Sequence, residues 1–196
     1  FWWCSSMKTR LYRFLAAMAC CVSMTGPSQA SCWLKTGGQA SRPFGHVEYC
    51  AAASGDCAKR KAAAKLPAVS LAKLRAVNRS VNKSIKPVSD KDLYGTREKW
   101  TKNTKAGDCE DYALTKRARL SSMGVSKANL LLAIGRSAGE AHTVLVVRTR
   151  DGDFVLNNLS DEVTPISRST LGISKIQSPE NGAEWLRVTG VMRSAG

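Results

Sequence analysis

Residues 107–111 carry the clearest chemical potential in the chain, because they place a cysteine among acidic residues at the predicted start of a helix. Asp108 is a good N-cap residue, and Asp111 stands three residues later, where an acid completes a capping box. The predicted helix runs to about Met123. Unpaired N–H groups and the positive dipole end of a first helical turn favour a thiolate. Cys109 is therefore a candidate nucleophile, although buried cysteines without any chemistry are also common in helices.

A histidine downstream of this cysteine is a candidate base. His142 is one of two histidines in the chain, and it opens a predicted strand that continues through the apolar and β-branched residues 143–147. The Asp-Gly pair at 151–152 predicts a hairpin turn, and residues 154–159 form the predicted return strand, which carries Asn157. A cysteine protease needs such a set, in which an imidazole moves the thiol proton and an amide or acid orients the ring. The alternative for His142 is a purely structural histidine.

Five stretches of the chain occur in the order typical of one family of enzymes. They are residues 43–50, 77–87, 90–95, 107–112 and 154–159. Through them the chain resembles, from Pro43 to Trp185, the bacterial transglutaminase-like cysteine proteinases. This papain-like family includes LapG-type periplasmic proteases that act on biofilm adhesins. The resemblance implies an α+β fold with a papain/transglutaminase-like core, in which the helix of the catalytic cysteine packs on an antiparallel β-sheet carrying His and Asn.

The same resemblance implies a role for each residue of the candidate triad. Cys109 corresponds to the nucleophile, His142 to the general base and Asn157 to the residue that orients the ring. One position departs from the family, which usually has Asp where this chain has Asn157. An amide accepts the ring N–H and fixes its tautomer, but it has no charge to stabilise an imidazolium. Papain-type enzymes nevertheless work with Asn in this role.

The resemblance also implies a calcium site. In the family members that cleave adhesins, acidic residues beside the nucleophile take part in binding a calcium ion. Asp108, Glu110 and Asp111 stand at the matching or adjacent positions. Carboxylate oxygens are the ligands that calcium prefers. Acids in a first helical turn also stabilise the helix without any metal, so both interpretations stay open.

Residues 1–30 are predicted to be an upstream extension followed by a signal peptide. Residues 1–6 precede the first Met, and a basic start at 7–13 leads into an apolar run at 14–24. A run of about eleven residues is too short for a membrane span. The segment ends in a small-residue cleavage pattern at Ala30. We therefore expect a periplasmic or secreted protein with a single domain over residues 31–196.

Export makes the cysteines candidates for disulfide bonds, because the compartment is oxidising. After cleavage at Ala30, the chain would keep Cys32, Cys50, Cys57 and Cys109. We expect Cys50 and Cys57 to close the short loop between them, and the alternative pairs Cys32 with one of the two. A zinc site is not expected, because the chain has no CxxC and His46 is the only histidine nearby. His46 is expected to be structural.

The composition is strongly basic, with 30 Lys and Arg against 15 Asp and Glu and a net charge of +15. Such a surface can bind nucleic acid, anionic lipids or an acidic protein. The basic residues are scattered, and the interleaved aromatic residues that stack on bases are missing, which argues against nucleic acid. The expected partners are a protein substrate, acidic or adhesin-like, and the anionic cell envelope.

The remaining pattern predicts a helical first half and a β-rich second half. Leu71, Leu74, Val77 and Val81 form the apolar stripe of a predicted helix over residues 67–84. We also expect a helix over 47–53, a connection over 85–95, and strands over 130–134 and 185–191.

Taken together, these features indicate an exported cysteine endopeptidase that hydrolyses peptide bonds through Cys109, His142 and Asn157, with calcium as a candidate cofactor. Two alternatives stay open. One is a transglutaminase, which transfers the acyl group of a glutamine side chain to an amine. The other is a catalytically silent peptide-binding module of the same fold. An electrophilic thiol probe separates an activated Cys109 from a silent one.

Overall fold

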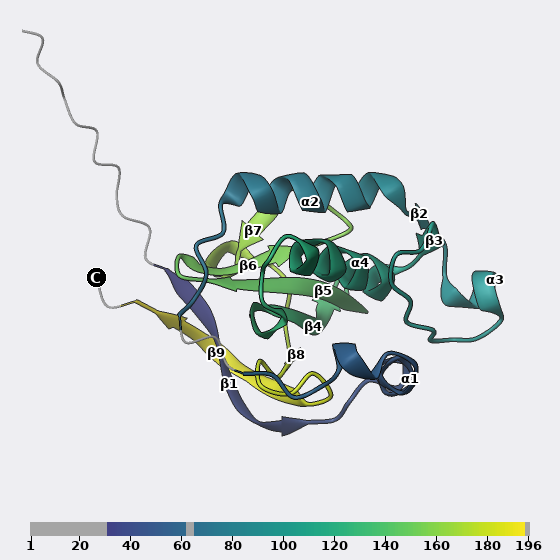
Figure 1. Cartoon of the computed structure of the whole chain (residues 1–196), viewed down its shortest axis with the longest axis horizontal. Coiled ribbons are helices and arrows are strands. Elements are labelled where there is room, and N and C mark those ends of the chain that lie inside the picture. Colours follow the sequence, from purple (N-terminus) through teal and green to yellow (C-terminus); the bar gives the residue numbers. More distant parts are fainter. Residues whose placement is uncertain (1–30, 62–64, 195–196) are drawn as a thin grey trace, which may run out of the picture.

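A seven-stranded antiparallel sheet lies at the centre of the computed structural model, which describes residues 31–61 and 65–194 (Figure 1). The strand order is β1-β9-β8-β4-β5-β6-β7. The strands are β1 (Cys32–Ala40), β4 (Leu130–Ser137), β5 (Glu140–Thr149), β6 (Gly152–Leu156), β7 (Val163–Pro165), β8 (Lys175–Gln177) and β9 (Trp185–Arg193). Two long helices, α2 (Leu71–Ser84) and α4 (Cys109–Ser122), lie together on one face of the strands β4 to β7 (Figure 1).

Shorter elements connect these strands and helices. They are α1 (Phe44–Ala52), α3 (Asp90–Tyr94), the parallel pair β2 (Lys86–Pro87) and β3 (Ala106–Gly107), and three 3-10 turns, Ser54–Asp56, Lys127–Asn129 and Ile166–Arg168. The predicted α+β class is confirmed. Among the described residues, none of the helices combines the length and apolar character that crossing a bilayer requires. The predicted signal peptide falls within residues 1–30, which lie outside the described residues.

The central strand β5 is buried on both faces, which explains its continuous apolar run. Leu145 and Val147 pack into the cluster under α2 and α4, whereas Val144 and Val146 belong to a second cluster on the opposite face. All four side chains are buried. Because β5 is fixed from both sides, the residue that opens its buried part, His142, is carried on a rigid strand.

Capping residues set where the two long helices begin. Asp108 and Asp111 form the predicted capping box at the start of α4. Helix α2 begins at Leu71, four residues later than predicted, because the side chain of Ser70 accepts a hydrogen bond from the backbone N–H of Lys73 at 3.2 Å. The carbonyl of Pro67 instead accepts a hydrogen bond from the backbone of residue 150.

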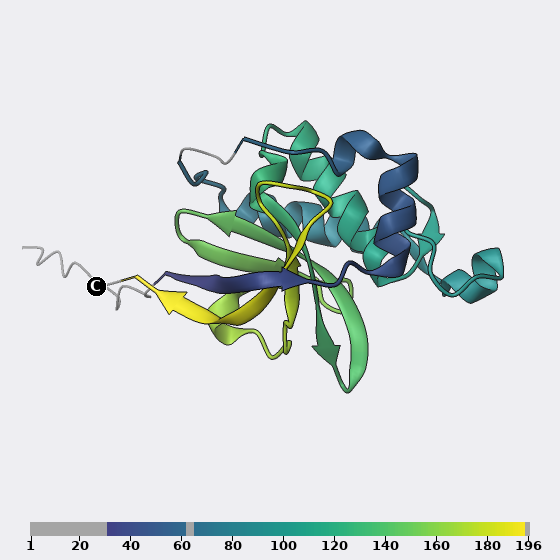
Figure 2. The same ribbon diagram turned by 90° about the horizontal axis from the view of Figure 1, so that it is seen from below.

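The first strand, β1, departs most from the sequence prediction, which made the first half helical. It pairs along β9, as the purple and yellow strands of Figure 2 show. Its backbone also contacts the β5–β6 hairpin, since the N–H of Leu34 donates to Asp153 and the carbonyl of Leu34 accepts from Arg148. The strand has two register shifts and contains Gly37 and Gly38, so it lacks a regular alternation.

The other element boundaries differ by a few residues from those predicted. The helix expected over 47–53 is α1 (Phe44–Ala52), and the strands expected over 130–134 and 185–191 are both longer. The strand expected over 154–159 is shorter. It ends at Leu156, which pairs with Leu145, so Asn157 follows the strand instead of lying within it.

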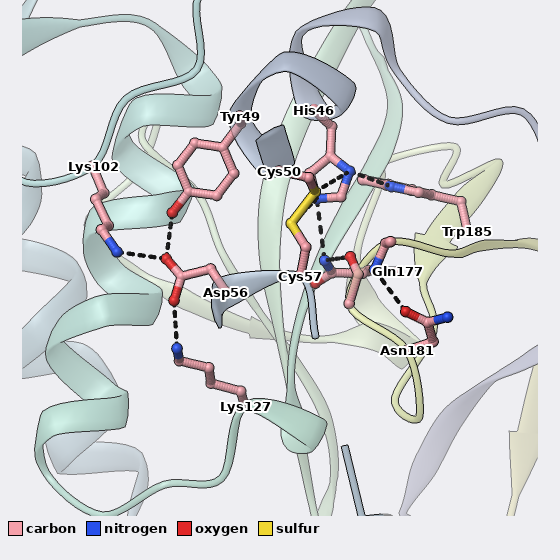
Figure 3. The surroundings of a disulfide bond; sticks show 12 residues. His46, Tyr49, Cys50, Asp56, Cys57, Lys102, Lys127, Gln177, Asn181 and Trp185 are labelled. Carbon is pink, nitrogen blue, oxygen red and sulfur yellow. Dashed lines mark hydrogen bonds and ion pairs between the residues drawn. A yellow bond between two sulfur atoms is a disulfide. The ribbon is translucent and has the colours of Figure 1, made fainter. Parts of the chain in front are cut away.

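A disulfide between Cys50 and Cys57 ties the end of α1 to the following turn, with a Cα–Cα distance of 5.5 Å. This is the pairing expected from the sequence. Figure 3 shows His46 beside this disulfide, where its Nδ1 accepts a hydrogen bond from Nε1 of Trp185 at 3.1 Å. His46 is fully buried, and burial lowers its pKa to about 4. Its ring is therefore neutral and structural.

We predict that replacing both Cys50 and Cys57 by Ala lowers the free energy of unfolding by about 2 kcal/mol, because the unfolded chain is no longer closed into a loop. Urea unfolding of the two proteins measures the difference. Mass mapping of the unreduced protein should show Cys50 joined to Cys57 and Cys109 alkylated. Equal unfolding midpoints, or Cys109 in a bridge, would contradict the prediction.

Candidate active site

The candidate nucleophile, Cys109, is the first residue of α4 and lies against the edge of β5. Its Sγ accepts a hydrogen bond from the backbone N–H of Thr143 at 3.3 Å. Strand β6 pairs with β5 only as far as Leu145, so the part of β5 that precedes Leu145 has no β6 partner. The N–H of Thr143 is thus available to the sulfur instead of to a neighbouring strand.

The other two predicted site residues meet in a direct hydrogen bond. Nε2 of His142 lies 2.8 Å from Oδ1 of Asn157. The same oxygen accepts a hydrogen bond from the backbone N–H of Leu159 at 3.0 Å, which identifies it as the oxygen of the amide. Because an amide oxygen only accepts, Nε2 carries the proton and the lone pair lies on Nδ1. This is the tautomer that a proton-accepting histidine needs.

Cys109 is connected to His142 through the backbone of Thr143, the residue that follows the histidine. Within the described residues, no hydrogen bond links Sγ of Cys109 to the ring of His142. The sulfur bonds to Thr143, which directly follows the histidine, and it donates to Oε2 of Glu110 at 3.3 Å. The sequence analysis did not identify Thr143, since its contribution is a backbone N–H and carries no side-chain signal.

Burial raises the pKa of the Cys109 thiol, and the charge of Asp108 adds to this effect. The hydrogen bond from Thr143 opposes it. The sequence analysis expected the helix N-terminus to favour the thiolate. In this protein, loss of solvent around the sulfur raises the thiol pKa more than the hydrogen bonds with Thr143 and Glu110 lower it. Formation of a thiolate at neutral pH would therefore need a nearby proton acceptor.

Three carboxylates gather beside the start of α4: Asp90, Asp108 and Asp111, each offering an oxygen within 4.8 Å of the others. Asp90 belongs to α3, and the sequence analysis placed it in a connection, because no local pattern shows that α3 meets α4. Glu110 forms an overlapping group with Asp108 and Cys109, and its side chain also interacts with that of Asp90. The structure therefore brings Asp108 together with both of the other predicted calcium ligands, Asp111 and Glu110.

In the acidic cluster, Asp90 and Asp111 are buried and Asp108 is half-buried, and not every oxygen has a hydrogen-bond partner among the described residues. Backbone N–H groups of Lys99 and Thr101 donate to Asp90 and Asp111, so the loop 96–102 is tied to the cluster. One oxygen each of Asp90 and Asp108 is buried with no hydrogen-bond partner among the described residues. Burial, together with the charges of Asp90 and Asp108, raises the pKa of Asp111 to about 7.

This donor set suits a hard cation. The cluster supplies only carboxylate oxygens, which calcium prefers, and two of these oxygens are buried without a partner. A positive ion would compensate the repulsion among the three acids. Acids that served only to stabilise the first turn of α4 would not need Asp90, which comes from a different helix.

Comparison with models of known protein families identifies the family of this chain. Residues 36–192 match the model of the bacterial transglutaminase-like cysteine proteinases (BTLCP). The chain belongs to this family. The match covers nearly all of the described residues, and it makes a peptidase with a protein substrate the family-level assignment. No significant match to a curated protein is found.

Solved structures similar to this chain include two forms of LapG of Legionella pneumophila. The calcium-bound form is 22% identical, with 64% of this chain and 71% of LapG covered and a TM-score of 0.49. The EGTA-treated form is 22% identical, with 63% and 71% covered and a TM-score of 0.47.

Gly107 lets this BTLCP chain pack its acidic cluster against the start of α4. A Cβ added at Gly107 would lie 2.7 Å from Cγ of Asp111 and 2.8 Å from its Cβ, so the carboxylate would have to move. We predict that Gly107→Ala lowers both the melting temperature and the rate of alkylation of Cys109. Gly55→Ala is the matched control, because a Cβ there meets nothing within 4 Å. Equal behaviour of the two variants would show that the packing at Gly107 is not critical.

Proposed function

We propose that this protein is an exported cysteine endopeptidase that hydrolyses peptide bonds with Cys109 as nucleophile, His142 as general base and Asn157 as orienting residue. The observation that carries the proposal is the 2.8 Å hydrogen bond between His142 and Asn157, next to the strand residue that bonds the sulfur of Cys109. Family membership supports a cysteine proteinase chemistry.

The proposed reaction has two halves, the formation of a thioester on Cys109 and its hydrolysis, and His142 accepts and returns one proton in each. Nδ1 of His142 removes the thiol proton of Cys109, and the sulfur attacks the peptide carbonyl carbon. The negative oxygen that forms would be stabilised by backbone N–H groups at the start of α4. His142 then gives its proton to the departing amine, which leaves a thioester on Cys109. Water, deprotonated by His142, hydrolyses this thioester and regenerates the thiol.

Asn157 keeps the ring of His142 aligned through both halves. Its Oδ1 accepts from Nε2 whether the ring is neutral or charged, so Nδ1 stays directed away from the amide. As an amide it adds no charge, and it therefore stabilises the imidazolium less than the carboxylate that the family usually has.

We predict that Cys109→Ala abolishes cleavage of a fluorescent casein substrate and leaves the melting temperature nearly unchanged, because the first turn of a helix accommodates a small residue. Cys32→Ala is the control for removal of a cysteine elsewhere. Cleavage by Cys109→Ala at the wild-type rate would refute the peptidase assignment. Incorporation of an amine into glutamine without cleavage would identify acyl transfer instead.

We further propose that Asp90, Asp108 and Asp111 hold a calcium ion. When bound, the ion would neutralise the carboxylates next to Cys109 and fix the loop 96–102 to the start of α4. The proposal rests on the shared carboxylate set and on the unpaired oxygens of Asp90 and Asp108. Glu110 lies beside this set, where its Oε2 accepts from the thiol of Cys109 and its side chain also hydrogen-bonds Asp90 and Asp108.

We predict that calcium raises the melting temperature of the protein and that EGTA reverses the shift. Saturation at a hundred times the dissociation constant would add about 2.7 kcal/mol to the free energy of unfolding. In Asp90→Asn, the calcium concentration that gives half of the melting-temperature shift should be at least tenfold higher than in the wild-type protein. Asp151→Asn is the control, since Asp151 is exposed in the β5–β6 turn. Equal calcium shifts in both variants would exclude Asp90 as a ligand.

The localisation and the partners belong to the same proposal. Cleavage near Ala30 would release residues 31–196 as a single domain into the periplasm or medium. There, a net charge of +12, which is the +15 of the whole chain less the three basic residues of segment 1–30, would favour an acidic or adhesin-like protein substrate and contact with the anionic envelope.

A further inference from the structure

The segment 157–162, which begins with Asn157, is held from one side by two asparagines of α2. Nδ2 of Asn82 donates to the backbone carbonyl of Asn157 at 3.1 Å, to the carbonyl of Ser160 at 3.0 Å and to Oδ1 of Asp161 at 3.1 Å. Nδ2 of Asn78 donates to the carbonyl of Ser160 at 2.9 Å. The two asparagines are four residues apart and so lie on one face of the helix.

These amide contacts are better placed to fix the segment than the ion pairs between the same elements. Arg75 lies 3.6 Å from Glu162, and Arg79 lies 3.8 Å from Asp161, but all four side chains are largely exposed. Exposed pairs of this kind contribute little. Asn78, by contrast, is fully buried. Asn82 is partly buried and is the α2 side chain that bonds Asn157 itself.

Asn157 needs such support because it lies beyond the end of β6. The last residue of β6 is Leu156, so no strand pairing fixes the peptide that follows. The side chain of Asn157 is bound to His142 and to the N–H of Leu159. Its main-chain carbonyl is bound to Asn82. A rotation of that peptide would move Oδ1 away from Nε2 of His142.

We propose that Asn82 is a positioning residue, which holds the carbonyl of Asn157 so that its side chain orients His142. This inference rests on the proposed function, because it assigns Asn82 to the same triad. Asn82 touches neither His142 nor Cys109 among the described residues, and it acts only through Asn157. Asn78 anchors the later part of the same segment and contributes to stability.

The test compares Asn82→Ala with Asn78→Ala, which removes an equivalent amide that does not bond Asn157. We expect Asn82→Ala to lower kcat for casein-derived peptides on the order of 10-fold, with KM within about 2-fold, because misplaced catalytic groups slow the chemical step. Compared with Asn82→Ala, Asn78→Ala should lower the melting temperature by more and kcat by less. Asn82→Asp, which has the same shape but no donor, should lose at least as much activity as Asn82→Ala.

A double-mutant cycle with Asn157→Ala tests whether Asn82 acts through Asn157. Because both changes would disrupt one arrangement, the double variant should be no slower than Asn157→Ala alone. Losses that multiply would overturn the proposal, as would equal losses of kcat in Asn82→Ala and Asn78→Ala. If Asn78→Ala does not fold, Arg79→Ala takes its place, since it removes only an exposed ion pair to the same segment.

Alkylation of Cys109 by iodoacetamide at neutral pH, followed by mass mapping, is a readout that needs no peptide substrate. Asn82→Ala and Asn157→Ala should slow it to the same extent, and Asn78→Ala should not. If the wild-type protein cleaves no peptide but this pattern holds, the peptidase proposal fails and the role of Asn82 stands. If cleavage occurs and alkylation is equal in all variants, the proposed role of Asn82 is refuted and the peptidase proposal stands.

Discussion

The hydrogen bond from the backbone of Thr143 to the sulfur of Cys109 exists because the ladder between β5 and β6 ends early. Past the pair Leu145–Leu156, one edge of β5 is open to a partner that is not a strand. The first turn of α4 takes that place and brings its cysteine against the strand. The residue that leaves β6 at this point, Asn157, is turned back towards His142. The length of one short strand therefore determines where all three candidate catalytic residues can meet.

The local features around this site could be predicted from the sequence, because they rest on short-range signals. The capping residues Asp108 and Asp111 mark the start of α4, and the apolar run after His142 marks β5. The roles of Cys109, His142 and Asn157 remain predictions, although the predicted hairpin does let His142 and Asn157 face each other across its two arms. The end of β6 was placed too late, since residues 157–159 have strand-like composition and nothing local shows that pairing stops at Leu156.

The features that were missed depend on contacts between distant segments. The sequence pattern placed Asp90 in a connection, and only the tertiary contact in which its backbone N–H donates to Asp108 brings it to Asp108 and Asp111. Asn78 and Asn82 read as polar positions beside the apolar stripe of α2. Their partners lie about 80 residues away, as the pairs Asn78–Ser160 and Asn82–Asn157 show. The strand β1 was missed for a similar reason, because its irregular sequence is ordered by β9.

The pairing of β1 with β9 joins the two ends of the described chain, with Cys32 opposite Arg193. On the ribosome, the first of these strands is made long before the second, so β1 must wait for almost the whole chain to be synthesised. Contacts this distant in sequence form slowly, and an unpaired strand is prone to wrong association in the meantime. The bridge between Cys50 and Cys57, by contrast, spans 7 positions and can close early. The pairing that completes the sheet therefore involves β1, the strand that is synthesised first.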